Sequence, residues 1–324
     1  MARAWIECMS SWLKRLIARK KPRSSAVLGV SLTPRGAGWC ALDLAGATPV
    51  LTASVAVNGQ FRTPLEAFDA LIKQQTPPAL PCQVCLSHEF YNLLLVDAPN
   101  VPDAELREAV KWRVKDLIAQ PIEKMVVDVF RLPADAYRGR MNMLYAALIE
   151  KATVSALVAA CEREHLTLEG IGIAELALAA ITRQLSGVEN LSLALLFMTG
   201  ERGSINLIEN GYLYFTRTLE LNASGGYSGN VDFQPDPTDN LALDIQRSLD
   251  YYESQLGKSG VNRLYVVTES KQQQQWCESL SQRLPVRVHL FPMGDLPGMD
   301  QTLDPLQQGL LVPAVGAALG GPRG

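Results

Sequence analysis

The chain has 324 residues, of which 48% are hydrophobic and 19% are charged, and its formal net charge is −3. This length corresponds to about two ordinary domains, and the apolar content excludes a mainly disordered chain. The small net charge argues against nucleic acid as the main partner. Six scattered cysteines, and no recognisable secretory leader with an apolar core, favour a reducing cytoplasm.

Residues 1–25 predict a basic amphipathic leader helix. Its apolar residues recur at helical spacing and include Trp5 and Trp12, and its many basic residues include Lys14 and Arg15. A basic helix with tryptophan on its apolar face suits an anionic membrane surface. We therefore expect these four side chains to contact the membrane surface, and a leader helix docked on protein is the alternative.

A first lobe is expected over residues 26–185. Strands are predicted at 27–30, 39–44, 50–57, 83–86, 91–96, 125–130, 143–149 and 168–173, and helices at 64–73, 151–164 and 174–184. One further helix begins at Pro102 and Asp103, because proline and acidic side chains suit the first turn, and ends at Pro121. This mixture of strands and helices predicts an α/β fold with a mixed sheet.

A second lobe is expected over residues 186–324, where the pattern of the first lobe restarts. Strands are predicted at 191–198, 204–208, 212–219, 264–268 and 286–290, and helices at 241–256, 271–284 and 309–319. Asn210-Gly211 predicts a type I′ hairpin turn. Residues 222–240 predict a polar loop. Each lobe begins with a strand, a glycine-containing turn and a second strand, which indicates a weak internal repeat.

Cys82 and Cys85 have the spacing of a zinc or redox pair. A zinc site needs a second pair of ligands, and although His88 is near, no such pair follows. The surrounding sequence is typical of a buried strand, in which thiols pack as small hydrophobes. We therefore expect no metal site here, with a metal or redox site as the alternative.

Three stretches of the chain carry a resemblance to a known family. Residues 101–130, VPDAELREAVKWRVKDLIAQPIEKMVVDVF, resemble the inserted-subdomain signature of PilM-type pilus assembly proteins. Residues 243–267 are similar to a helix and strand of that family's second lobe, and residues 312–321 to its closing Ala/Gly-rich helix. The resemblance implies an actin-like (ribonuclease H-like) two-lobed α/β fold. A subdomain of about residues 99–166 is then inserted in the first lobe, and the final helix returns to that lobe.

The resemblance also implies where a nucleotide site would lie. The family's first hairpin usually carries the sequence Gly-Ile-Asp-Ile-Gly-Ser. The matching positions begin at Gly29, and Ser31 replaces the acid while Thr33 replaces the second glycine. Carboxylates position magnesium against polyphosphate, and glycines let backbone N–H groups approach phosphate closely. The first hairpin therefore predicts a vestigial loop.

The other two nucleotide loops depart from the family pattern in the same way. In the second hairpin Phe197 replaces the acid and Thr199 replaces a glycine, ahead of Gly200. The adenosine loop usually carries consecutive glycines, which are absent at Thr268. Losing all three features predicts a protein that is not an enzyme and has no cofactor, with weak ATP binding as a remaining alternative. The alternative function is an actin-like protein that binds ATP and switches conformation with it.

The resemblance implies a cytoplasmic scaffold, peripheral on the bacterial inner membrane, in a type IV pilus assembly platform of the mannose-sensitive haemagglutinin type. The implied partners are the tail of a PilN-like bitopic membrane protein and other platform proteins. Family members hold that tail in a groove between the core of the first lobe and the inserted subdomain. Our candidates near the groove are Trp112, Arg113 and Asp128. Core packing is the alternative for Trp112, and a solvated face or an ion pair is the alternative for the other two.

Overall fold

The computed structural model describes residues 25–185, 187, 191–200, 202–221, 237–295 and 304–320. The predicted leader, with Trp5, Trp12, Lys14 and Arg15, lies outside these residues, as does most of the 222–240 loop. No helix within the described ranges is both long and apolar enough to cross a membrane.

The first five-stranded sheet is built around the hairpin that begins the described chain. Its order is β3 (Val50–Asn58), β2 (Gly36–Asp43), β1 (Ala26–Thr33), β4 (Pro81–Leu86) and β8 (Thr167–Ile173). The first three strands pair antiparallel, and β4 and β8 continue the sheet in parallel. The expected mixed sheet is therefore confirmed, and β8 is one of its edge strands.

The second five-stranded sheet repeats this topology. Its order is β11 (Tyr212–Glu220), β10 (Arg202–Glu209), β9 (Ser192–Thr199), β12 (Arg263–Thr268) and β13 (Arg287–Leu290). The antiparallel and parallel pairs fall in the same places as in the first sheet. Asn210 and Gly211 connect β10 to β11 with φ values of 52° and 72°, as a type I′ turn requires. The internal repeat expected from the sequence is confirmed.

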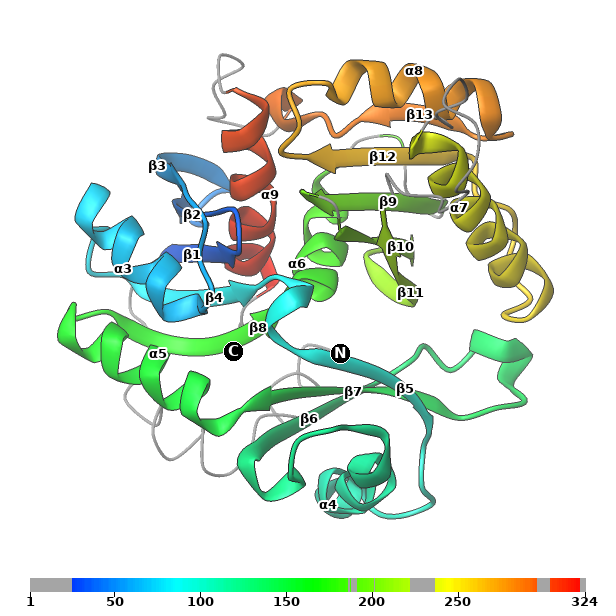
Figure 1. Ribbon diagram of the computed structural model, residues 1–324, viewed down its shortest axis with the longest axis horizontal. Coiled ribbons are helices and arrows are strands. Elements are labelled where there is room, and N and C mark those ends of the chain that lie inside the picture. The colour runs from blue at the N-terminus through cyan, green and yellow to red at the C-terminus, as the bar shows by residue number, and fades with distance from the viewer. Residues whose placement is uncertain are drawn as a thin grey trace, which may run out of the picture.

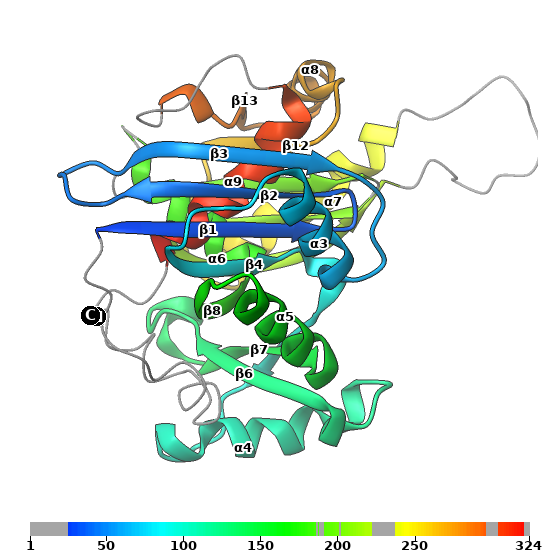
Figure 2. The same cartoon turned by 90° about the vertical axis from the view of Figure 1, so that its left-hand side faces the viewer.

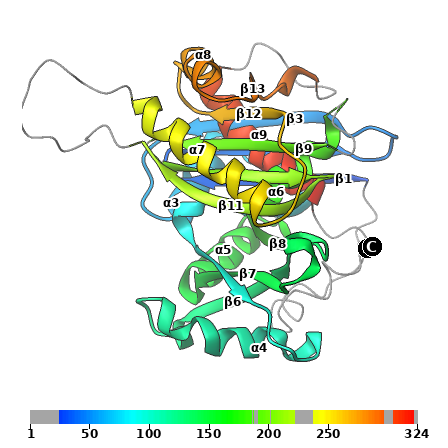
Figure 3. The ribbon, with the colours of Figure 1, turned by 90° about the vertical axis from the view of Figure 1, so that its right-hand side faces the viewer.

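Helices cover the sheets in layers (Figures 1 and 3). The outer face of the first sheet carries α3 (Pro64–Gln74) and α5 (Lys151–Arg163), and that of the second carries α7 (Pro237–Ser254) and α8 (Gln273–Arg283). Between the two sheets lie α6 (Ala174–Ile181) and α9 (Pro305–Gly320). These two inner helices are apolar almost all round, because both of their sides are covered.

The inner helices approach their neighbours at glycines. A Cβ atom placed on Gly29 of β1 would lie 2.0 Å from the carbonyl oxygen of Ala314 in α9. A Cβ atom on Gly316 would lie 2.1 Å from the carbonyl oxygen of Ala177 in α6. Gly29 is thus required for the packing of helix α9 on strand β1.

The change Gly29→Ala is expected to lower the free energy of unfolding by about 1–3 kcal/mol, because the added methyl group forces α9 away from β1. Urea denaturation followed by circular dichroism measures the change. Gly46→Ala is the matched control, since its Cβ would meet no atom closer than 3.5 Å. Equal stabilities of the two variants would contradict the packing role of Gly29.

A third, smaller sheet is inserted between β4 and α5. It consists of β5 (Asn92–Asp97), β7 (Met143–Glu150) and β6 (Met125–Arg131), in that order. Helix α4 (Asp103–Val114) packs on one face of this sheet through Leu106, Val110 and Val114. Figure 2 shows α4 below the small sheet and α5 and β8 above it. We call β5, α4, β6 and β7 with their connections the inserted subdomain.

The bounds of 99–166 that the sequence suggested differ from this arrangement at both ends. Strand β5 lies before residue 99 but pairs with β7 along its whole length. Helix α5 lies inside the suggested range, yet Leu157 and Cys161 pack in the core of the first lobe. Strand pairing and helix packing, which sequence periodicity does not report, decide both boundaries.

The connection between β6 and β7 fastens the inserted subdomain to the second lobe. Lys258 Nζ lies 2.6 Å from Asp135 Oδ2 and 2.9 Å from Glu209 Oε2. The hydroxyl groups of Tyr137 and Tyr251 lie 3.0 Å apart. Tyr137 and its neighbour have positive φ, a conformation that side chains disfavour. The inserted subdomain therefore contacts both lobes.

Candidate functional site

The expected acid positions of the two hairpins do not face an open site. Ser31 is buried, and its hydroxyl group donates a hydrogen bond to the carbonyl oxygen of Leu310 in α9. Phe197 is 0% exposed and packs in the core between the sheets, beside residues of α6 and α9. Helix α9 thus covers the region to which the first strand of each hairpin would present a carboxylate.

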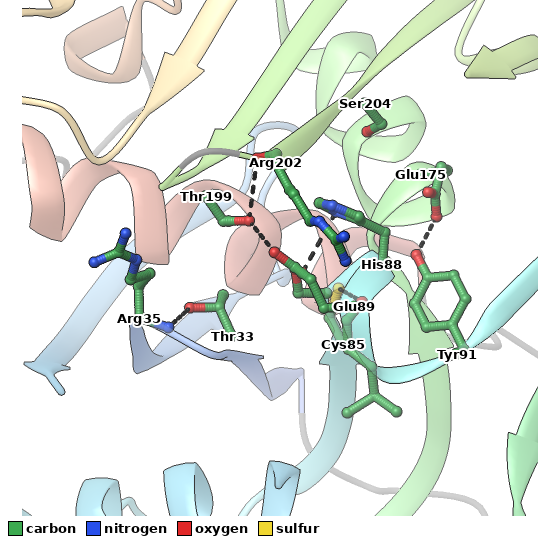
Figure 4. Close-up of polar contacts among 12 residues, drawn as sticks. Thr33, Arg35, Cys85, His88, Glu89, Tyr91, Glu175, Thr199, Arg202 and Ser204 are labelled. Atoms are coloured by element: carbon green, nitrogen blue, oxygen red, sulfur yellow. Dashed lines mark hydrogen bonds and ion pairs between the residues drawn. The ribbon is translucent and has the colours of Figure 1, made fainter. Parts of the chain in front are cut away.

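Contacts between the lobes occupy the tips of the hairpins (Figure 4). Thr199 at the end of β9 donates a hydrogen bond of 2.5 Å to Glu89, which follows β4. Thr33 Oγ1, at the end of β1, lies 3.4 Å from Oε1 of Glu269, the residue that follows β12. The guanidinium group of Arg35 lies against Gly200, where a Cβ atom would be 2.6 Å from its nitrogen atoms. The three expected loops therefore lie close together, and direct contacts of their side chains occupy the space between the lobes.

These residues do not fit a magnesium–nucleotide complex. Two hydroxyl-bearing side chains, Thr33 and Thr199, stand where phosphate needs open backbone, and Thr268 bonds to the backbone N–H of Ser270. Among the described residues, no group of three or more histidine, cysteine, aspartate or glutamate side chains could hold a metal ion.

Glu269, at the contacts between the lobes, binds its proton more tightly than an ordinary glutamate does. Burial raises its pKa from 4.5 to about 7, and the charge of Glu89 adds to the rise, while Arg35 and the hydrogen bond from Thr33 oppose it. The folded protein therefore holds a proton on this carboxyl that the unfolded chain releases at lower pH.

We expect this carboxyl to make the fold less stable as pH rises from about 4.5 to about 7, because the folded state binds more protons in that window. The full shift corresponds to a loss of about 3 kcal/mol. Glu269→Gln should remove this part of the pH dependence and be more stable than wild type at pH 8. Denaturation of both proteins across this range measures the difference. Glu278→Gln, on the exposed face of α8, is the control, and a wild-type-like pH profile for Glu269→Gln would contradict the expectation.

The two cysteines with zinc-like spacing lie on opposite faces of strand β4. Cys82 packs in the core under α3 and α5, whereas Cys85 packs in the core between the sheets. Residues three apart on a strand point to opposite faces, so these thiols cannot share one ion. Both are buried and free, in agreement with the packing interpretation.

A groove of about 80 Å³ lies between the first lobe and the inserted subdomain. One wall is formed by the edge strand β8 through Ile171, Gly172 and Ile173. The opposite wall is the face of the small sheet away from α4, with Val126, Asp128, Ala147 and Ile149, and Leu86, Tyr91, Leu148 and Val154 complete the lining. We call this feature the β8 groove. It is mainly apolar, with one carboxylate on its wall.

The structure separates the three residues suggested for partner binding. Asp128 lines the β8 groove, and its carboxylate lies 3.2 Å from Arg107 Nε of α4. Trp112 and Arg113 instead lie exposed on α4, on the other side of the small sheet. Trp112 is 68% exposed, which excludes core packing for this side chain, and Lys115 Nζ lies 5.7 Å from its ring centre. Helix α4 directs its aliphatic stripe inward, so its other face projects away from the groove.

The sequence did not single out several polar residues of the cleft. Glu89 and His88 follow strand β4 directly, Tyr91 comes just before β5, and the carboxyl of Glu175 is buried at the start of α6. A hydrogen bond from the Tyr91 hydroxyl to Glu175 joins two of them. The one available signal was Glu175, an acid within the otherwise apolar helix sequence AELALAAI.

Comparisons with known proteins define the fold. No protein-family model and no curated protein sequence matches the chain. It is similar to a solved structure of a PilM–PilN type IV pilus biogenesis complex, with a TM-score of 0.66 and 17% identity over 93% of this chain and 98% of that chain. It is also similar to a protein of actin-like ATPase fold and unknown function from Bacteroides thetaiotaomicron, with a TM-score of 0.53 and 10% identity over 89% and 96%. The chain therefore has the two-lobed actin-like α/β fold, with a subdomain inserted in its first lobe.

Proposed function

We propose that this protein is a non-catalytic scaffold of a type IV pilus assembly platform on the cytoplasmic face of the bacterial inner membrane. It holds the cytoplasmic tail of a PilN-like bitopic membrane protein in the β8 groove. The observation that carries the proposal is this groove, which joins an apolar lining to an edge strand. The leader residues Trp5, Trp12, Lys14 and Arg15 would add a contact with the membrane surface.

The groove has the features that recognition of an extended peptide needs. Strand β8 is paired with β4 on one side, and among the described strands none pairs with its other side. A peptide that extends the sheet there gains main-chain hydrogen bonds and places alternate side chains in pockets. Those side chains would contact Val126, Ala147 and Ile149, so we expect apolar anchors in the tail. Asp128, which is paired with Arg107, also lies on this wall.

The likeness to the PilM–PilN complex supports the proposal, since that solved complex contains PilM together with PilN. The match covers 93% of this chain and 98% of the matched chain. The finer proposal is a protein like MshI, the PilM-like component of mannose-sensitive haemagglutinin pili. The basic leader and the degenerate nucleotide loops favour that branch. The proposed scaffold binds other platform proteins as well, and it does not bind nucleic acid.

The proposed scaffold does not hydrolyse ATP. Support comes from Ser31 and Phe197 at the expected acid positions and from the contacts of Thr33 and Thr199 with carboxylates across the cleft. We expect calorimetric titration with magnesium-ATP to give no magnesium-dependent binding in the micromolar range. Tight, magnesium-dependent binding would instead favour the alternative of an actin-like protein that switches conformation with ATP.

Co-purification with the partner tail tests the proposal. The full chain and a tagged N-terminal tail of the PilN-like protein encoded beside it are expressed together, and a tail with scrambled sequence is the control. A stable complex with the native tail alone is the expected result. If neither tail is retained, the proposed scaffold role in tail binding is overturned.

A further inference from the structure

A second cavity, separate from the β8 groove, lies where the inserted subdomain faces the second lobe. Its volume is about 360 Å³, at the lower end of the range for small-molecule sites. We call it the interlobe cavity. Its polar lining includes His88, Glu89, Tyr91, Glu175, Arg202 and Glu220. Figure 4 shows that His88, Glu89, Tyr91, Glu175 and Arg202 come from both lobes and from the segment that leads into the subdomain.

His88 is the most unusual residue in the cavity wall. Only 7% of its side chain is exposed, and neither ring nitrogen has a hydrogen-bond partner among the described residues. Glu89 is a charged neighbour, with 3.5 Å between His88 Nδ1 and Glu89 Oε2. Buried polar atoms are normally paired, because leaving one unpaired costs about 1–3 kcal/mol. The ring nitrogens can therefore form hydrogen bonds with a group that enters the cavity.

Acidic side chains outnumber basic ones in the wall of the cavity. Glu89, Glu175 and Glu220 reach it from three different elements. Among the described residues that line it, Arg202 is the one lysine or arginine, and Arg202 Nη2 lies 3.1 Å from Glu220 Oε1. Within the described part of the wall, no lysine or arginine pairs with Glu89 or Glu175. An ionised acid in this wall would repel a phosphate or carboxylate ligand.

The other groups in the wall are compatible with a positively charged ligand. Burial lowers the pKa of His88, with Glu89 opposing and Arg202 adding to this effect, so the neutral ring keeps one nitrogen as an acceptor. Tyr91 and Tyr145 also line the cavity.

We propose that the interlobe cavity binds a small organic cation with primary ammonium groups, of the aliphatic diamine or polyamine class. The unpaired imidazole nitrogen and the carboxylates of Glu89 and Glu175 accept hydrogen bonds from the ammonium groups. This site is distinct from the β8 groove, although Tyr91 lines both of them.

Several titratable groups face Glu175 in the cavity. Burial raises the pKa of Glu175, and Glu89 adds to the rise, while the hydrogen bond from Tyr91 opposes it. Cys85 and Tyr145 are the other titratable groups that interact with it. An ammonium group nearby favours the ionised form of this carboxyl.

Calorimetry of the full chain with putrescine and spermidine tests the site. We expect saturable binding of both cations. Glu175→Gln, which keeps the acceptor for Tyr91, should weaken binding roughly tenfold to a hundredfold. Glu278→Gln on α8 should bind as wild type does.

Two neutral or anionic probes complete the test. Butanediol and inorganic phosphate should give no binding, because they lack the ammonium groups. No heat with putrescine or spermidine up to millimolar concentration would overturn the proposal, as would binding of butanediol or phosphate in their place. The wild-type measurements with the cations and with the two probes decide the question even if Glu175→Gln fails to fold.

Discussion

Replacing Phe197 with aspartate is expected to unfold the protein at neutral pH and not to restore a magnesium site. Phe197 is fully buried between the sheets, so the change removes an aromatic side chain from the core and places a charge there. Loss of the ring alone costs about 3–5 kcal/mol, and an unpaired buried carboxylate adds to it. We expect a total loss of about 5 kcal/mol or more, a large part of the usual 5–15 kcal/mol of stability. Chemical denaturation at pH 7 measures it.

The pH dependence of the Phe197→Asp variant gives an internal check. Burial raises the pKa of the new carboxyl in the folded state, so the variant should regain stability as pH falls and the group takes up a proton. Phe197→Leu, which keeps an apolar side chain, is the control and should lose much less stability. A stable Phe197→Asp protein that binds magnesium-ATP would show that this position still belongs to a nucleotide site.

Ala147→Arg is expected to weaken binding of the PilN-like tail by at least about a hundredfold, because the long side chain fills the β8 groove. Ala147 on β7 lies directly opposite Asp128 on β6, so the new arginine can share this carboxylate with Arg107. Fluorescence anisotropy with a labelled tail peptide measures the affinity, and thermal unfolding confirms that the variant is folded.

Trp112→Ala is the matched control for the groove variant. The side chain is exposed on α4, on the far side of the small sheet, so its removal should change tail affinity less than about threefold. If Trp112→Ala abolishes binding while Ala147→Arg binds normally, the tail docks on α4 and the assignment of the β8 groove is wrong.

Much of the fold follows from local sequence patterns. The strand ends, the Asn210-Gly211 turn and the two matching hairpins are local, because strand alternation and positive φ depend on a few neighbouring residues. The substitutions at Ser31 and Phe197 are also visible in the sequence, since the motif fixes their register within each hairpin.

The candidate site was less accessible to sequence analysis. Residues of the interlobe cavity such as His88, Glu175 and Arg202 are far apart in the chain, and no spacing rule links them. Asp128 could be placed on a strand, but not on the wall of a groove. Tryptophan is a large apolar residue type that often packs in a core, and only the packing of α4 shows that Trp112 is exposed.

The sequence by itself determined the α/β elements and their repeat, because these depend on periodicity and turn chemistry, whereas the resemblance to PilM-type proteins implied the insertion and the acid positions of the hairpins. The tertiary structure alone decided that α9 covers Ser31 and Phe197, that β5 belongs to the inserted subdomain, and which side chains line the β8 groove and the interlobe cavity. These features are contacts between elements distant in the chain. Such contacts follow from the way sheets and helices pack, which no local stretch of residues specifies.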